Sequence, residues 1–218
     1  MALPVSPARS AEPGRFQGKA VVEWLDDAFV PSMRVVQAFG FRQADGPLWQ
    51  VPPGQVLSES GMPPLFRDLT ELRDSGGQLF DSSFRQSALV YVSAVQSMSK
   101  PWDAAQRMFL EACVTEGVPV PEAKAMYALL AAQGSRWEVP GSRCFGSCHG
   151  LTQPLTWRPV VDETRVRDMM KWVRAKDPTL AEIDARARTA INATGPHIFP
   201  QPECSRVLGA TATRGGCN

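Results

Sequence analysis

The chain has 218 residues, of which 44% are hydrophobic and 21% are charged, and its formal net charge is +1. This is enough for one domain with a hydrophobic core. Because 23 basic residues nearly balance 22 acidic ones, the sequence offers no strong field for nucleic acid or anionic lipid, and we expect neither as a partner. There is no apolar run of membrane-spanning length and no signal-peptide pattern, so we expect neither export by the usual route nor membrane insertion.

Proline is concentrated near both ends of the sequence. The chain has 19 prolines, and residues 1–18 and 196–218 show no hydrophobic periodicity. We interpret these two segments as extended arms outside a single α+β domain at 19–195. An ordered proline-rich arm needs a surface to lie on, so the arms predict contacts with other protein subunits of an assembly.

Strand signals occupy the first part of the domain. Two β-prone runs flank a turn at Asp45-Gly46, a pattern typical of a β-hairpin. Pro52 and Pro53 end the hairpin, because proline has no N–H to donate to a neighbouring strand. In chain order, we expect strands at 20–25, 33–43 and 48–51, a loop at 55–65 and a helical turn at 64–72.

Helical periodicity predominates from residue 81 onward. The first segment is apolar on all sides from Ala88 to Val95, which predicts a central buried helix; a buried strand is the competing interpretation of residues 88–92. The second and third segments end in glycine and are joined by a short connection, which predicts an antiparallel helix pair. The expected helices are 81–98, Pro101 to Gly117, Pro121 to Gly134, 164–175 and 180–193.

Several of these helices begin near side chains that can cap them. Asp81 or Ser82 can cap the first helix, and Ser99 can cap the second. Thr179, followed three residues later by Glu182, forms a capping-box pattern for the last helix. The body of the domain is therefore expected to be mainly helical, with a small N-terminal antiparallel sheet packed on it.

The order and spacing of several short motifs resemble a known family. The motifs are Trp49 to Gly54, Met62-Pro63, Phe84-Arg85, Pro101-Trp102, Arg107-Met108-Phe109, Ala123 to Tyr127, and Gly134 to Trp137. Over about residues 20–140 the chain resembles the phage and bacterial proteins catalogued as domain of unknown function 1353. The resemblance implies a phage context, with the helices at 160–194 as a C-terminal extension.

The resemblance also marks positions where the family carries polar residues. In the family pattern, the loop after the hairpin has an Asp and a Ser, and the central helix has a His-Asp pair followed by an aromatic residue. The matching positions here are Ser58 and Gly61 in the loop, and Tyr91, Val92 and Ser93 in the helix. A His-Asp pair can ligate a metal or relay a proton, whereas Tyr-Val can do neither at neutral pH. The resemblance therefore implies a member whose polar centre has been replaced.

The cysteines and histidines form one short pattern. Cys144, Cys148 and His149 make a C-x3-C-H run, which differs by one residue from the covalent haem motif and would need Cys204 or His197 to complete a zinc site. A Cys148–His149 dyad is disfavoured, because neighbouring side chains in an extended loop usually point apart. We interpret the run as a loop cysteine pair, free or bridged. The odd cysteine count argues against a complete disulfide framework; the five are Cys113, Cys144, Cys148, Cys204 and Cys217.

Other polar groups have structural interpretations. Asp26-Asp27 and Glu122 are acidic, but paired carboxylates act in catalysis only where the environment separates their pKa values. Gly76-Gly77 lacks the lysine and the Ser/Thr of a phosphate-binding loop, and Arg214-Gly215-Gly216 is too short for an RNA-binding repeat. We therefore expect no catalytic, cofactor-binding or metal-binding residue.

Cysteine and tryptophan also indicate parts of the core. Cys113 falls within an expected helix and is interpreted as a small core residue. Trp49, Trp102 and Trp137 stand at element boundaries, where the simplest interpretation is that they anchor the core and donate their N–H to a backbone carbonyl. If exposed, they would instead be anchors of a protein interface.

These observations predict a non-catalytic structural or interaction protein of a phage or phage-derived particle, located in the virion or the host cytoplasm. The motif resemblance, the replaced polar centre, the near-neutral charge and the two arms favour this function. One alternative is a hydrolase of a phage-lysis or cell-wall pathway. A second alternative is an inhibitor or immunity partner derived from an active relative.

Overall fold

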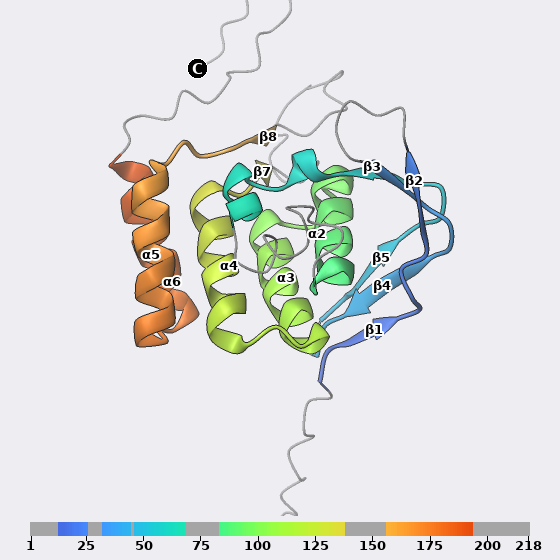
Figure 1. Cartoon of the computed structure of the whole chain (residues 1–218), viewed down its shortest axis with the longest axis horizontal. Coiled ribbons are helices and arrows are strands. Elements are labelled where there is room, and N and C mark those ends of the chain that lie inside the picture. The colour runs from blue at the N-terminus through green and yellow to red at the C-terminus, as the bar shows by residue number, and fades with distance from the viewer. Residues whose placement is uncertain (1–12, 26–31, 45, 69–82, 138–155, 194–218) are drawn as a thin grey trace, which may run out of the picture.

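The computed structural model describes residues 13–25, 32–44, 46–68, 83–137 and 156–193. Two small antiparallel sheets lie at one end of the molecule and helices make up most of the rest, which confirms the predicted α+β fold (Figure 1). The helices follow in chain order from the sheets outward. They are α2 (Arg85–Ser97) and α3 (Trp102–Glu116), then α4 (Val120–Gln133), and then the pair α5 (Glu163–Lys176) and α6 (Leu180–Asn192). None of the helices in the described part of the chain is long and apolar enough to cross a bilayer.

The strands form two three-stranded antiparallel sheets and one short pair. The first sheet has the order β1-β4-β5, formed by Arg15–Gln17, Phe39–Arg42 and Leu48–Val51. The second has the order β2-β3-β6, formed by Val22–Leu25, Ser32–Val35 and Val56–Ser58. The pair consists of β7 (Arg136–Trp137) and β8 (Thr156–Trp157). Strands β4 and β5 are the predicted hairpin, with Phe41 opposite Trp49.

The strand region differs from the sequence prediction in two places. The run at 33–43 is not one strand, because residues 36–38 carry the chain from β3 in one sheet to β4 in the other. The expected loop at 55–65 contains β6, which pairs with β3 and buries Leu57 completely. After β6 come two 3-10 helices, η1 (Glu59–Gly61) and η2 (Pro64–Asp68), and η2 lies in the predicted helical turn.

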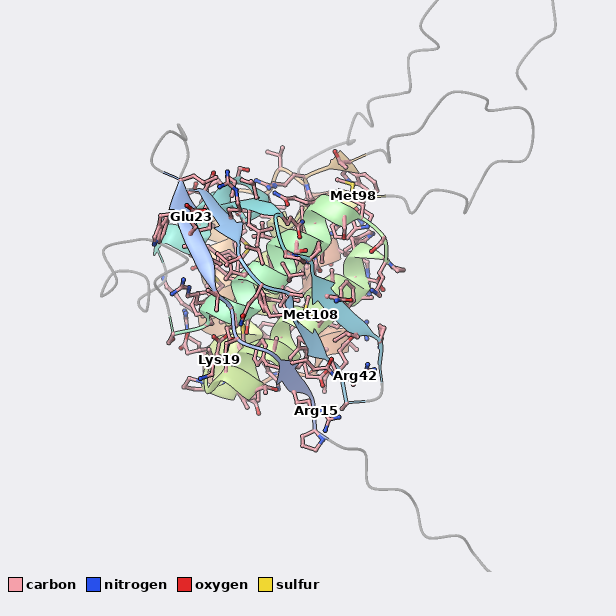
Figure 2. All side chains as sticks on the ribbon, turned by 90° about the vertical axis from the view of Figure 1, so that its right-hand side faces the viewer. Arg15, Lys19, Glu23, Arg42, Met98 and Met108 are labelled. Atoms are coloured by element: carbon pink, nitrogen blue, oxygen red, sulfur yellow. The ribbon has the colours of Figure 1, made fainter. Side chains whose placement is uncertain are left out.

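The segment expected to be an N-terminal arm contributes a strand. Arg15–Gln17 form β1, which pairs with β4 so that Arg15 lies opposite Arg42. Figure 2 shows these two arginines at the same corner of the sheet. The ring of Phe16 packs against that of Phe41, with 5.0 Å between the centroids. This part of the N-terminal segment therefore belongs to the folded body.

The helices lie close to their predicted positions. They are α2 (Arg85–Ser97), α3 (Trp102–Glu116), α4 (Val120–Gln133), α5 (Glu163–Lys176) and α6 (Leu180–Asn192). The predicted antiparallel pair is α3 and α4, and Gly117 ends α3 with a φ of 103° that favours glycine. Gly134 ends α4 in an extended conformation. The capping box of Thr179 and Glu182 is present at the start of α6, as predicted.

The starts of α2 and α3 do not use the predicted caps. Asp81 and Ser82 lie outside the described residues, and Phe84 at the α2 N-cap makes no side-chain hydrogen bond. Ser99 does not cap α3, which starts after Pro101; its hydroxyl instead faces that of Ser97 at 3.4 Å. The last residue of α3 caps the N-terminus of α2 instead. The Glu116 carboxylate accepts hydrogen bonds from the backbone N–H groups of residues 86 and 87.

Two helices are buried on nearly all sides. Helix α2 is buried from Ser87 to Val95, as predicted, and the competing interpretation of a strand at 88–92 is wrong. Helix α4 is buried from Ala125 to Gln133, a wider surface than the apolar side predicted from its periodicity, because α3 packs on one side and α5 and α6 on another. Cys113 is fully buried on α3, as predicted.

Candidate functional site

The positions marked by the family resemblance lie together in the structure. Ser58 ends β6 and caps η1, accepting a hydrogen bond from the Ser60 N–H at 3.3 Å. Gly61 ends η1 against α2, where a Cβ on Gly61 would lie 3.5 Å from Cγ1 of Val92. The loop positions and the α2 positions are thus brought into contact, although more than 30 residues separate them in the sequence.

The α2 side of this contact is closely packed. Tyr91 and Val92 are both fully buried, and the Tyr91 ring packs on Phe109 with 5.3 Å between the centroids. Burial raises the pKa of the Tyr91 hydroxyl well above its usual range, and nearby Arg158 and Gln106 offset this only in part, so the group is neutral at physiological pH. Gln106 lies near the hydroxyl, but no hydrogen bond of normal geometry joins them.

One charged side chain near Tyr91 could not be found from the sequence. Arg158 follows β8, outside the span that resembles the family, and its guanidinium lies close enough to affect the Tyr91 hydroxyl. Its Nη2 donates to the Ser60 carbonyl and to Ser135 Oγ, each at 3.1 Å. The marked positions are therefore apolar at their centre but have a guanidinium at their edge. Arg158 also joins η1 to the segment after α4.

A pocket of about 300 Å³ opens elsewhere, between α3, α4, α6 and β7. Three arginines, two aspartates and one tyrosine provide most of its polar lining. These residues are Asp103, Arg107, Tyr127, Arg136, Asp184 and Arg188. Unlike the packed contact at Val92, this site combines open space with charged side chains.

The polar groups of the pocket form a connected network. The Tyr127 hydroxyl donates to Oδ1 of Asp184 at 2.6 Å, and Arg107 Nη2 lies 3.4 Å from Oδ2 of the same carboxylate. Burial and the adjacent Asp184 raise the pKa of Tyr127 well above its usual range. The Arg136 guanidinium lies over the Trp102 ring at 4.5 Å, and burial lowers its pKa. Tyr127 is consequently a neutral donor that holds the Asp184 carboxylate in place.

The predicted candidates that the structure describes have structural roles. Glu122 pairs with Arg174 through both carboxylate oxygens, with an Nε–Oε1 distance of 2.8 Å, and so joins α4 to α5. Trp137 donates to the Lys100 carbonyl, as predicted, whereas Trp49 donates to the Gln43 side chain instead. Trp102 is only partly buried. Within the described ranges, no group of three or more His, Cys, Asp or Glu side chains is placed to hold a metal ion.

The other candidates lie outside the described residues. These are Asp26, Asp27, Gly76, Gly77, Cys144, Cys148, His149, His197, Cys204, Arg214, Gly215, Gly216 and Cys217. The haem, zinc and disulfide alternatives for these cysteines therefore stay predictions from the sequence.

The sequence contains a signal for the pocket that lies outside the motifs described above. Asp103 and Arg107 stand four residues apart on α3, and Asp184 and Arg188 stand four residues apart on α6. Residues at this spacing lie on one face of a helix. The two faces meet, and the ion pair forms across them, between Arg107 and Asp184. Their approach depends on how α6 packs, which the spacing alone does not specify.

Comparisons with protein-family models, with curated proteins and with solved structures found no match.

The two tyrosines of the chain make a matched test of these environments. Tyr127→Phe removes the hydrogen bond to Asp184, and we expect it to lower the free energy of unfolding by roughly 1.5 kcal/mol. Tyr91→Phe removes a buried hydroxyl that has no partner, so it is expected to be neutral or slightly stabilising. Urea denaturation followed by circular dichroism measures both. If Tyr91→Phe lowered the free energy of unfolding more than Tyr127→Phe does, the hydrogen bonding that the structure gives the two hydroxyls would be wrong.

Proposed function

We propose that this chain is a non-catalytic interaction protein, a structural component of a phage or phage-derived particle. The motif resemblance supports the phage context. The proposal rests on one structural observation above all, the packing at the positions that the resemblance marks as the polar centre.

A substrate needs space and reactive groups at such a centre. Here Val92 is fully buried against Gly61, and the neighbouring hydroxyl of Tyr91 is neutral and enclosed. Ser93 is the next position that the resemblance marks, and its hydroxyl donates to Gln55 Oε1 at 2.7 Å. This hydrogen bond joins α2 to the connection between β5 and β6. These contacts favour a stabilising role for the segment over a catalytic one.

The proposal is tested by the behaviour of the two terminal segments. The full chain is compared with a variant lacking residues 1–12 and 196–218, using light scattering and limited proteolysis, alone and with the structural proteins of the same particle. We expect the full chain to join the assembly and its ends to become protected from protease, and the truncated chain to stay a folded monomer. A full chain that stays monomeric with protease-resistant ends, or a truncated chain that assembles equally well, would contradict the proposal.

The alternative of a hydrolase has one observation in its favour. Asp103 and Asp184 both line the open pocket, and a pair of carboxylates can serve as acid and base. However, Asp184 is already held by the Tyr127 hydroxyl and by Arg107, and these contacts restrict its movement. A turnover assay on cell-wall fragments decides: activity that Asp184→Asn abolishes would establish the hydrolase, and absence of turnover would remove it.

A further inference from the structure

We propose that the pocket between α3, α4, α6 and β7 binds a small molecule through a carboxylate or phosphate group, with Arg136 and Arg188 as its main ligands. This binding site is additional to the interaction role proposed above and does not depend on it.

The charges around the pocket leave two guanidinium groups available. Asp184 is matched by the Arg107 ion pair and by the Tyr127 hydroxyl. Neither Arg136 nor Arg188 has a carboxylate within ion-pairing distance in the described part of the chain. Three arginines against two aspartates leave the lining with one net positive charge, so the pocket favours an anion.

Arg136 is held in place before any ligand arrives. Its backbone belongs to β7, where it pairs with Trp157 of β8. Its guanidinium lies over the Trp102 ring, and Nη2 donates to the Ala131 carbonyl at 3.0 Å. A planar guanidinium fixed in this way loses little conformational entropy when it binds an oxyanion.

Arg136 also carries a charge that is partly removed from water. Its Nε is buried without a hydrogen-bond acceptor, and burial lowers the pKa of the guanidinium, although arginine stays protonated. An oxyanion beside this side chain would offset the loss of hydration through charge-assisted hydrogen bonds. Arg188 is exposed on α6 and lines the same pocket, where it supplies the second guanidinium group.

The size and the apolar part of the lining limit the ligand class. A volume of about 300 Å³ is at the low end for ligand pockets, so the ligand is a small molecule rather than a polymer. Ala131 and Ala187 provide an apolar surface between the charged groups. The ligand we infer therefore has one oxyanion group and a short apolar part.

The experiment is an NMR titration of the full chain with inorganic phosphate and, separately, with acetate, at constant ionic strength set by chloride. The two probes separate a preference for phosphate from a preference for carboxylate. We expect a saturable shift of the Arg136 Nε–H and Trp102 indole N–H signals with at least one probe. The indole signals of Trp24 and Trp49, which do not line the pocket, should stay in place.

Three variants make the titration decisive. Arg136→Gln and the exposed Arg188→Gln should each weaken the binding by about tenfold, as expected for the loss of one charge-assisted contact. Arg165→Gln, an exposed position on α5 outside the pocket, should leave it unchanged. Circular dichroism establishes that each variant is folded, and Arg188→Gln keeps the test valid if Arg136→Gln does not fold. The proposal is overturned if neither probe gives a saturable shift, or if the pocket variants bind as tightly as the control.

Discussion

Replacing Phe109 with alanine is expected to lower the free energy of unfolding by roughly 3–5 kcal/mol. The side chain is fully buried on α3, and three aromatic rings surround it. The centroids of Phe66, Phe84 and Tyr91 lie 5.9, 6.3 and 5.3 Å from its own. Removing the ring leaves a cavity where η2, α2 and α3 meet, and the neighbouring helices can fill it only in part.

Urea denaturation followed by circular dichroism measures the Phe109 effect. The matched control is Val114→Ala on the same helix, which is 40% exposed and should change the stability by less than about 0.5 kcal/mol. Phe109→Leu keeps most of the volume and should cost about 1.5 kcal/mol or less. If Phe109→Ala cost no more than Val114→Ala, Phe109 would not hold the position in the core that the structure gives it.

Glu116→Gln is expected to destabilise the protein by about 2–3 kcal/mol, more than an ordinary surface charge change. The carboxylate receives three hydrogen bonds at the start of α2. The donors are the Gln86 N–H at 2.9 Å, the Ser87 N–H at 2.9 Å and the Ser87 hydroxyl at 2.6 Å. A glutamine has one acceptor oxygen and no charge, so it leaves at least one of these donors without a partner and weakens the interaction with the helix N-terminus.

The effect of Glu116→Gln has a local signature. Hydrogen exchange should become faster at the amides of Gln86 and Ser87, because their acceptor is weakened. Glu163→Gln is the control: this residue lies in the first turn of α5, its side chain is 62% exposed and it pairs only weakly with Arg167. Equal losses of stability in the two variants, or unchanged exchange at the start of α2, would show that Glu116 does not cap that helix.

The local features of the fold followed from the sequence, because neighbouring residues determine them. The periodicity of α3, α5 and α6, the glycine that ends α3 and the Thr179–Glu182 capping box are of this kind. Strand β6 has only three residues and its alternation is too short to recognise, since pairing with β3 decides it. The cap from Glu116 could not be predicted either, because 30 residues separate donor and acceptor.

One of the two candidate sites could be located from the sequence and the other could not. The motif pattern marks Gly61 and Val92, and the structure brings these two residues into contact. The pocket was missed because its charged residues come from helices far apart in the sequence; Arg107 and Asp184 are 77 residues apart. A charged residue on an amphipathic helix is usually solvated. The sequence pattern around it is the same whether the side chain faces solvent or faces another helix across a pocket.

The burial of α4 between α3 and the α5–α6 pair means that residues 20–140 lack part of their core when they are expressed alone. A fragment ending near residue 140 would expose the alanine- and leucine-rich flank of α4 that Val166, Met169, Val173 and Ile183 adjoin in the intact core. Such a fragment is expected to self-associate rather than to stay an independently folded monomer. Residues 20–140 therefore depend on α5 and α6 to cover this flank of α4.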